Sequence, residues 1–329
     1  MHSHGTLLEM ARAMCHMQLN EDQTVLLVSA MAHMVGFCMV FLSALVNGAT
    51  TVITQPFDFE SSLDAHSRWR CTYTMALPVM LQSLLKLQMQ APRDVSSGRF
   101  FFCGGDSVSA ALQEAFRMHF KPVCEAYGAT EIAPSCWNRP KEVRIGSIGR
   151  PAPETEFRLV NADGSQTQPG AVGEICIRGP HLAIGYWQDP EATRAAMHDG
   201  WFRSGDLATR DSDGFYWFAG RKKEVIVRGG SNISPQEVEA ALYEYPAIAE
   251  IGVIGKRDPV WGETVVAHVV PRPGHRLDEA EVIAFARERL ADYKVPGTVI
   301  FHSELPKGPT GKIQRRALRE AEDALATVS

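Results

Sequence analysis

The sequence has no paired cysteines. Its 329 residues include seven cysteines, and none of them forms a Cys-x-x-Cys pair. This spacing predicts neither a zinc site nor a disulfide framework. An odd number of dispersed thiols is typical of proteins of a reducing cytoplasm, so we expect a cytoplasmic location. The cysteines are Cys15, Cys38, Cys71, Cys103, Cys124, Cys136 and Cys176.

Other absences exclude further classes. The net charge of −5 gives no electrostatic footprint for nucleic acid, and the sequence contains no internal repeat and no low-complexity tract. The first four residues have neither the basic segment nor the apolar run of a secretory signal. One apolar stretch, at residues 25–53, is long enough to suggest a membrane span, but His33, Gly36 and Asn47 interrupt it. We expect it to form buried strands and a buried helix instead.

Alternating apolar segments predict an α/β fold for the first part of the chain. Strands are expected at residues 25–30, 50–54, 71–75, 100–103 and 123–126. Helices are expected at residues 6–19, 35–46, 59–68, 78–89 and 109–119, and a capping box of Thr6 and Glu9 should open the first of them. This order predicts a mostly parallel sheet covered by helices.

Two further regions differ in character. Glycine and proline separate short strands, such as 174–178 and 215–219, between residues 146 and 220, as in a β-rich subdomain. Beyond residue 221, Ser234 and Glu237 predict a capping box with Pro235 at the first helical position. Strands at 248–254 and 264–270 and a helix at 278–290 complete a small α+β unit.

The predicted fold class is therefore α/β, with two domains. Residues 1–220 are expected to form the remaining part of a large N-terminal domain, comprising an α/β subdomain at 1–145 and a β-rich subdomain at 146–220. Residues 221–329 are expected to form a small α+β C-terminal lid domain.

Two glycine-containing loops carry side chains that suit a nucleotide. In Tyr-Gly-Ala-Thr-Glu, residues 127–131, the tyrosine can stack on a base, the threonine can bond a phosphate oxygen and the glutamate can hold Mg²⁺. In Ser-Gly-Asp-Leu, residues 204–207, Asp206 can accept hydrogen bonds from two ribose hydroxyls. Taken alone, each loop is also explained by an ordinary turn, in which these residue types are common.

Two later loops carry lysine. Gly-Arg-Lys-Lys-Glu, residues 220–224, lies at the predicted domain boundary. A charged cluster is commonly a solvated surface, but a hinge or a phosphate contact is the alternative at this position. In Pro-Thr-Gly-Lys-Ile, residues 309–313, Lys312 is suited to meet a developing phosphoryl charge, with a surface lysine as the alternative. The loop is not a Walker A motif, because Gly-x4-Gly-Lys-Ser/Thr is absent.

Together and in this order, the four loops resemble the acyl-CoA synthetase, adenylation-domain and luciferase superfamily. The resemblance runs from Met1 to about Arg319. Further matching pieces are His-Met-Val-Gly at 33–36, Gly-Gly-Asp at 104–106, Gly-Glu-Ile at 173–175, Gly-Tyr-Trp at 185–187, Asp258 with Gly262 and Glu263, and Tyr-Lys-Val-Pro at 293–296.

The resemblance implies a two-step reaction. In that family ATP and a carboxylate give an acyl-adenylate and pyrophosphate, and the C-terminal domain then rotates so that CoA can attack. The implied cofactors are ATP, Mg²⁺ and CoA, and the implied partner is a fatty, alicyclic or aromatic carboxylic acid. The implied nucleotide and metal contacts are Tyr127 on adenine, Thr130 on the α-phosphate, Glu131 on Mg²⁺, Asp206 on ribose, Arg221 near ribose and phosphate, and Gly105 in the nucleotide site.

Other residues match catalytic, hinge and pocket positions. Lys312 matches the lysine that bridges the carboxylate and the α-phosphate, and Lys223 matches the hinge residue. His33 matches the histidine beside the carboxylate site, although a core histidine at the start of an apolar helix is the alternative. The resemblance places Gly230 beside the pantetheine tunnel and the acyl pocket near Gly104, Ala129 and Ile132. Small residues at 104 and 129 leave room for an aliphatic or aromatic acid.

The sequence departs from the family at its start. Residues 1–5, Met-His-Ser-His-Gly, resemble the segment that follows the family's Ser/Thr/Gly-rich phosphate-binding loop. We therefore expect that loop to be missing and the isolated chain to be impaired. A fragment, a mis-called start and one half of a split enzyme, with a separate chain supplying the missing part, are the alternatives. Two alternatives to a CoA ligase stay open at this point: an adenylation domain that loads a carrier protein, and an inactive remnant that binds a nucleotide or a partner.

Overall fold

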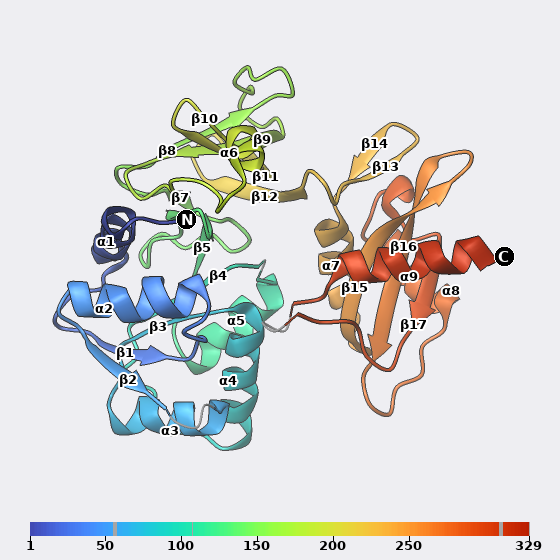
Figure 1. Ribbon diagram of the computed structural model, residues 1–329. Coiled ribbons are helices and arrows are strands. Elements are labelled where there is room, and N and C mark those ends of the chain that lie inside the picture. Colours follow the sequence, from blue (N-terminus) through green and yellow to red (C-terminus); the bar gives the residue numbers. More distant parts are fainter. Residues whose placement is uncertain (55–57, 107, 309–311, 329) are drawn as a thin grey trace. The chain divides into compact units, whose positions relative to one another are not determined.

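The chain forms two compact units in the computed structural model, which describes residues 1–54, 58–106, 108–308 and 312–328 (Figure 1). The first unit comprises Met1–Ser204 and Ala208–Phe218, and the second comprises Gly205–Leu207 and Ala219–Ser329. The mixed α/β class, with a larger first part and a smaller C-terminal part, is confirmed. The limits at residues 145, 146, 220 and 221 stay predictions.

A seven-stranded sheet organises the first unit, in the order β2-β1-β3-β4-β5-β6-β7. The first five strands in this order pair in parallel, and the last two pairings are antiparallel. The carboxyl ends of the parallel strands therefore share one edge of the sheet. The strands are β1 (Thr24–Leu27), β2 (Thr50–Ile53), β3 (Tyr73–Ala76), β4 (Phe100–Gly104), β5 (Val123–Ala129), β6 (Ile132–Trp137) and β7 (Arg150–Pro151).

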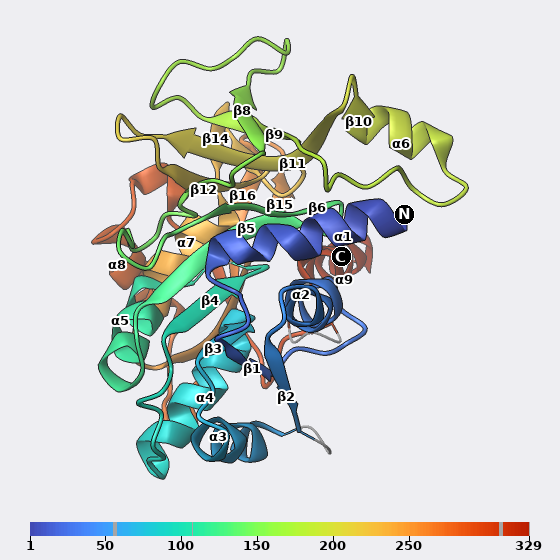
Figure 2. The ribbon, with the colours of Figure 1, turned by 90° about the vertical axis from the view of Figure 1, so that its left-hand side faces the viewer.

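Helices cover both faces of this sheet (Figure 2). Successive residues of β1 and the residue after it show the alternation: Val25 and Leu27 join one apolar cluster, whereas Leu26 and Val28 join the other. The first cluster includes residues of α1, η1, η2 and α2, and the second includes residues of α3, α4 and α5. The helices are α1 (His4–Ala13), η1 (Met14–Met17), η2 (Val35–Leu42), α2 (Ser43–Val46), α3 (Phe59–Arg68), α4 (Pro78–Gln90) and α5 (Ala110–His119).

Two helical predictions near the N-terminus were wrong in detail. Helix α1 begins before Thr6, because Ser3 is the N-cap and exchanges hydrogen bonds with Thr6 in a capping box. Glu9 instead pairs with Arg12 at 2.9 Å. Residues 35–46 are helical, but 35–42 form a π-helix.

A second sheet, in the order β10-β11-β9-β8 with β12 beside β11, forms the β-rich region. Its apolar residues meet those of β5 and β6 in one cluster that contains Tyr127, Ile132 and Phe202. The elements are β8 (Glu156–Val160), β9 (Gly173–Arg178), α6 (Pro190–Ala196), β10 (Met197–His198), β11 (Trp201–Arg210) and β12 (Tyr216–Arg221).

The second unit has its own sheet, in the order β14-β13-β16-β15 with β17 beside β16. Its core contains residues of α7 and α8. The elements are β13 (Ile226–Arg228), β14 (Ser231–Ile233), α7 (Pro235–Tyr243), β15 (Ile248–Asp258), β16 (Gly262–Pro271), α8 (Glu279–Arg287), η3 (Asp292–Lys294), β17 (Thr298–Phe301) and α9 (Arg315–Val328).

Helix α7 begins where the sequence predicts, with Pro235 in its first turn, but without the expected capping box. The hydroxyl of Ser234 donates to Oε1 of Gln236 at 3.0 Å, so it does not cap the helix backbone. The carboxylate of Glu237 pairs with Lys294. In the part of the chain that the structure describes, no helix is long and apolar enough to cross a membrane.

Candidate functional site

Several of the predicted site residues follow the parallel strands at one edge of the first sheet. His33 follows β1, Gly104 ends β4, Gly105 comes next, and Tyr127 lies near the end of β5. The carboxyl edge of such a sheet is where open α/β folds bind ligands. The structure thus gathers these four residues along one edge, within the first unit.

Glycine is required where β4 ends. A Cβ atom at Gly104 would lie 2.6 Å from the carbonyl oxygen of Ala126 on β5, which is too close for any side chain. Gly105 has φ of +83°, which glycine adopts without strain. The backbone can therefore turn sharply at this point and stay close to the neighbouring strand.

The motif at 127–131 forms a tight hairpin. Ala129 on β5 pairs with Ile132 on β6, so Thr130 and Glu131 make a two-residue turn between the strands. Thr130 is exposed and Glu131 is half-buried. The turn therefore presents a hydroxyl and a carboxylate next to each other, as the predicted α-phosphate and Mg²⁺ contacts require.

Segments that are distant in the sequence form three hydrogen bonds with this turn. The hydroxyl of Tyr186 donates to Oε1 of Glu131 at 2.7 Å, and the amide of Ala183 donates to the carbonyl oxygen of Glu131 at 2.7 Å. Nε2 of His2 lies 2.8 Å from the carbonyl oxygen of Thr130. Partial burial, and then the hydrogen bond to Glu131, raise the pKa of Tyr186 to about 12, so its hydroxyl stays a donor at neutral pH.

Tyr127 is largely buried, with its ring among other aromatic rings. The ring centroid lies 6.1 Å from that of Phe157 and 6.5 Å from that of Phe218. The ring is therefore held in place by its neighbours before any ligand binds. That it stacks on adenine stays a prediction.

His33 lies just before the π-helix. Its Nδ1 accepts a hydrogen bond from the amide of Val35 at 3.2 Å, which assigns the proton of the neutral ring to Nε2. A Cβ atom at Gly36 would lie 2.2 Å from the carbonyl oxygen of Ala30, so the loop before the helix packs directly on its backbone. His33 is thus part of a rigid structure as well as a candidate ligand contact.

The two remaining pocket residues differ in exposure. Ala129 is half-buried, whereas Ile132 has no exposed surface and packs with Ile148 and Ile175. Ile132 therefore supports the turn from beneath, and any influence on a pocket would act through the position of that turn.

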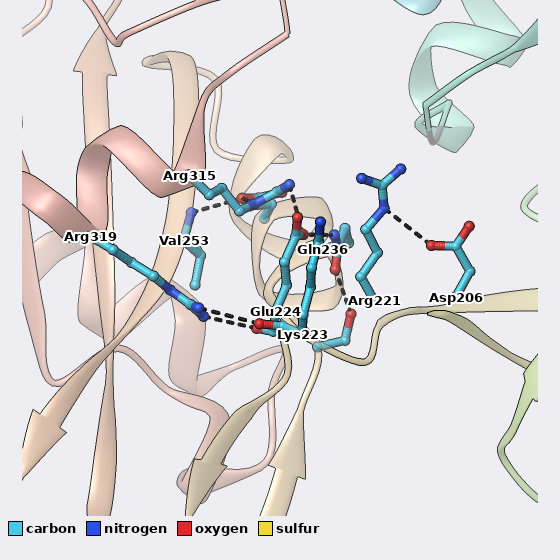
Figure 3. A network of polar contacts seen from close by, with 10 residues as sticks. Asp206, Arg221, Lys223, Glu224, Gln236, Val253, Arg315 and Arg319 are labelled. Carbon is cyan, nitrogen blue, oxygen red and sulfur yellow. Dashed lines mark hydrogen bonds and ion pairs between the residues drawn. The ribbon is translucent and has the colours of Figure 1, made fainter. Parts of the chain in front are cut away.

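The second unit contains the predicted ribose contact. Nε of Arg221 lies 3.1 Å from Oδ1 of Asp206 (Figure 3). Asp206 is only 9 % exposed. The amide of Lys222 also donates to the carbonyl oxygen of Gly205 at 2.8 Å. Residues of the second and third loops therefore meet although they lie about fifteen positions apart.

The predicted hinge residue lies in a tight turn. The amides of Glu224 and Val225 both donate to the carbonyl oxygen of Arg221, at 2.9 and 3.0 Å, so Lys223 lies within a single helical turn. Gly230 belongs to a different turn, the two-residue connection of β13 to β14, in which Gly229 and Gly230 have φ of +56° and +83°. Positive φ at both positions is the geometry of a type I′ hairpin, which explains the two glycines.

Lys312 lies beside a short antiparallel bridge. The amide of Gly308 donates to its carbonyl oxygen at 2.8 Å, and Lys307 forms an antiparallel bridge with Ile313. Residues 309–311 of the predicted motif lie outside the described residues. Because Lys312 and the Thr130–Glu131 turn belong to different units, their meeting in a single site stays a prediction.

The sequence interpretation missed the supporting residues. Tyr186 was noted only as part of a matching Gly-Tyr-Trp segment, and its hydrogen bond to Glu131 spans 55 positions. Arg315 and Arg319, which contact the turn at 221–224 (Figure 3), were not singled out, because they belong to no recognised motif. The spacing of arginines along a helix does not reveal which distant residues their side chains contact.

The family described as AMP-binding enzyme matches residues 1–187, and the family described as AMP-binding enzyme C-terminal domain matches residues 237–312. The chain is 38 % identical over 306 residues to an indoleacetate–CoA ligase of Aromatoleum aromaticum, which covers 92 % of this chain and 60 % of that protein. It is also 38 % identical to a feruloyl-CoA synthase of an Amycolatopsis species, covering 96 % of this chain and 65 % of the relative.

Solved structures agree with these relatives. ATP-bound MatB of Rhodopseudomonas palustris superposes with a TM-score of 0.91 at 29 % identity, over 98 % of this chain and 65 % of that one. The anthranilate CoA ligase AuaEII in complex with anthranoyl-AMP gives a TM-score of 0.90 at 29 % identity, over 99 % of this chain and 65 % of that one. The chain thus spans about 60–65 % of the length of these proteins.

Proposed function

Because the chain belongs to the AMP-binding enzyme family, we propose that it acts in an ATP-dependent, AMP-forming acid–thiol ligase. In this proposal a carboxylic acid reacts with ATP to give an acyl-adenylate and pyrophosphate, and CoA then displaces AMP to give a thioester. A carboxylate is a poor electrophile, and the adenylate supplies a good leaving group. The phosphoryl centre needs positioning and charge neutralisation more than a protein nucleophile.

The turn at Thr130 and Glu131 carries this proposal. It presents a hydroxyl and a carboxylate at the edge of the sheet where Gly104 and Gly105 bring the backbone close to a neighbouring strand. Three hydrogen bonds from residues 2, 183 and 186 fix it. A preorganised turn of this kind suits a transition state whose stabilisation is electrostatic.

The remaining residues take the following roles in the proposal. Tyr127 stacks on the adenine, Thr130 donates to the α-phosphate, and Asp206 accepts hydrogen bonds from the ribose hydroxyls. Arg221, already paired with Asp206, orients that carboxylate and lies beside the phosphate. Lys312 places its ammonium between the substrate carboxylate and the α-phosphate during adenylation, Lys223 serves as the hinge, and Gly230 borders the path of the pantetheine arm.

Glu131 fits the chemistry of a Mg²⁺ ligand. Among the described residues no group of three or more His, Cys, Asp or Glu side chains could hold a metal by itself. Mg²⁺ often binds through one or two carboxylates together with substrate phosphates and waters, and a single half-buried carboxylate meets that need. When bound, Mg²⁺ would neutralise phosphate charge; the role of Tyr186 is to hold Oε1 of Glu131 so that Oε2 is presented.

The proposed acid has an apolar aromatic, alicyclic or aliphatic acyl part. Gly104 and Ala129 leave space at the edge of the sheet, and His33 lies along the same edge beyond β1. The named relatives act on indoleacetate and on feruloyl groups, which makes aryl acids the first candidates. Seven unpaired thiols fit a reducing compartment, and we propose the cytoplasm.

The test is an assay of both half-reactions. Pyrophosphate release is measured with ATP, Mg²⁺ and indoleacetate, ferulate or a long-chain fatty acid, and thioester formation is then measured with CoA or with a carrier protein. The 329-residue chain is assayed alone and as a fusion in which the N-terminal segment of the feruloyl-CoA synthase relative precedes Met1. Acyl-CoA formation by either protein supports the proposal. Acylation of the carrier protein alone, or no pyrophosphate release by either protein, would overturn it.

A further inference from the structure

Helix α9 holds the turn at 221–224 through two arginines (Figure 3). Arg319 donates from Nη1 to the carbonyl oxygen of Lys223 at 3.3 Å and from Nη2 to that of Glu224 at 3.2 Å. Arg315 donates from Nη1 to the carboxylate of Glu224 at 3.2 Å. The helix therefore forms hydrogen bonds with both the backbone and a side chain of a turn that lies more than ninety positions earlier in the chain.

Arg315 is itself anchored in the core of the second unit. Its Nε and Nη2 donate to the two carboxylate oxygens of Glu239, at 3.0 and 2.5 Å. The same carboxylate accepts a hydrogen bond from the amide of Val253 on β15 at 2.7 Å. Gln236 donates to Glu224 at 3.1 Å from helix α7. The turn is thereby connected to α9, α7 and β15 at once.

We propose that Arg315 and Arg319 are positioning residues that lock the turn at 221–224 to helix α9. The lock makes Arg221 and the segment that carries Lys312 parts of one rigid body. The existence of the lock does not depend on the proposed function, and only its catalytic consequence rests on that function.

The chemistry of arginine suits this role. Its planar guanidinium presents several donors in a fixed fork, so a single side chain can satisfy two neighbouring carbonyl oxygens. The carbonyl groups of Lys223 and Glu224 lie between β12 and β13, where no strand ladder is described. A lysine at position 319 would offer a point charge and could not reproduce both bonds with the same geometry.

The lock extends to Lys312 because α9 begins three residues after it. The backbone amide of Gln314 donates to the carbonyl oxygen of Pro306 at 2.8 Å, and Lys307 forms an antiparallel β-bridge with Ile313. Ile313 packs against a buried cluster that includes Leu305 and Leu318. The base of the Lys312 loop, the first turns of α9 and the turn at 221–224 are therefore tied together by backbone bonds, apolar packing and charged hydrogen bonds.

In the proposed reaction this lock fixes the position of Lys312 relative to the Arg221–Asp206 pair. Arg221 pairs with Asp206, the proposed ribose contact, while Lys312 acts on the α-phosphate. If the lock loosens, the ribose contact can still form, but the ammonium of Lys312 no longer has a fixed position relative to it. Loss of Arg319 should therefore lower the rate constant for adenylation more than it raises the KM for ATP. Thioester formation from supplied acyl-adenylate, which does not use Lys312 in the proposal, should be much less affected.

Limited proteolysis tests the lock without any assumption about activity. The turn contains three sites for trypsin, at Arg221, Lys222 and Lys223, and the 329-residue chain is digested under native conditions. The variants are R319A, R319K and R315A, with R316A as the matched control, because Arg316 is 91 % exposed and pairs with Glu320 on its own helix. Mass spectrometry of the fragments measures cleavage at the turn alone.

We expect cleavage at the turn to be faster in R319A by at least about tenfold, the factor for the loss of one of its two charge-assisted hydrogen bonds, and intermediate in R319K. R316A should match the unchanged chain. Equal rates in R319A and R316A would overturn the proposal. R315A removes both guanidinium hydrogen bonds to Glu239 and can unfold the unit, so circular dichroism is recorded for each variant and R319K decides the outcome if the alanine variants are unfolded.

The half-reaction assay then tests the catalytic consequence. R319A and R316A are compared in the form of the protein that adenylates its substrate. Unequal loss, with adenylation slowed at least about tenfold more than thioester formation, supports the assigned role, and equal loss of both half-reactions overturns it. If the unchanged protein shows no adenylation at all, the proposed function fails, and the proteolysis result still decides whether the lock exists.

Discussion

The hydroxyl of Tyr186 donates a hydrogen bond of 2.7 Å to Oε1 of Glu131. Tyr186 is in turn held by Thr193, whose hydroxyl accepts from the amide of Tyr186 at 2.9 Å and donates to the carbonyl oxygen of Asp189 at 2.8 Å. The start of helix α6 thus fixes the tyrosine, and the tyrosine fixes the carboxylate. One oxygen of Glu131 is engaged in this way before any ligand arrives.

The first prediction follows from this contact. In Y186F the carboxylate of Glu131 loses a donor and gains freedom to rotate, so we expect a higher Mg²⁺ concentration for half-maximal binding of ATP. Loss of one such bond corresponds to about tenfold. Binding of AMP without Mg²⁺ should change little. Isothermal titration calorimetry of ATP at a series of Mg²⁺ concentrations measures the effect.

The matched control is the neighbouring Trp187→Phe, since Trp187 is 74 % exposed. It should leave the Mg²⁺ dependence unchanged. If Y186F and W187F showed the same Mg²⁺ dependence, Tyr186 would have no role in presenting Glu131.

The second prediction concerns Asp206. Its carboxylate is nearly buried and pairs with Arg221 at 3.1 Å, so D206A should remove a charge-assisted pair of ribose hydrogen bonds and leave Arg221 without this partner. We expect binding of AMP or of an acyl-adenylate analogue to weaken by about ten- to a hundredfold, measured by calorimetry. D213N, a substitution of an exposed aspartate that pairs with Arg144, should bind as the unchanged chain does. Equal affinities for D206A and D213N would remove Asp206 from the nucleotide site.

Much of the first unit could be predicted from the sequence because its signals are local. The helix predicted at 59–68 has those bounds, since Asp58 caps it, and the helix predicted at 109–119 begins at Ala110 because Ser109 is its N-cap. Pro78 marks the start of α4 in the same way. Caps and prolines act within three or four residues, so a single sequence reveals them.

The errors arose where contacts outside the expected motifs decide the geometry. The π-helix at 35–42 lies against Ala30 through the missing side chain of Gly36, and nothing in an apolar run announces that contact. Ser234 was expected to cap α7, but its hydroxyl is taken by Gln236, which also reaches Glu224. Likewise, the sequence could suggest Glu131 as a Mg²⁺ ligand, but it could not predict the hydrogen bond from Tyr186 to Glu131.

The third prediction concerns stability and pH. Burial, the largest cause, raises the pKa of Glu125 on β5 to about 8, against a value of 4.5 for an ordinary glutamate. Gln113 donates to this carboxyl at 3.2 Å. The folded chain therefore keeps the proton between about pH 4.5 and pH 8, where the unfolded chain has lost it. The resulting contribution to the free energy of unfolding is fully present below the unfolded pKa and is lost as pH rises through the folded pKa.

E125Q mimics the protonated form and should abolish this loss. Relative to E125Q, the unchanged chain should become less stable between pH 5 and pH 9, by about 1.4 kcal/mol for each unit of pKa difference. The midpoint of urea unfolding at the two pH values measures this. E114Q is the control, because Glu114 is exposed and its pKa is lowered by Arg117, so it is ionised at both pH values whether folded or unfolded. A pH-independent difference between E125Q and the unchanged chain would contradict the assignment.

The last prediction separates the two half-reactions through Lys312. In K312A the ammonium that should neutralise the developing charge between the substrate carboxylate and the α-phosphate is absent, so we expect adenylation to slow by about a hundredfold or more. Thioester formation from supplied acyl-adenylate should persist, because the proposal assigns Lys312 to the adenylation step alone and AMP leaves without its help. K307A is the matched control: Lys307 lies on the other arm of the same loop and pairs with Glu250 at 2.5 Å. It should leave both half-reactions within about twofold, the range of a surface ion pair. Equal loss of both half-reactions in K312A would show that Lys312 supports the fold of the loop, and the assignment of a step-specific role would then be wrong.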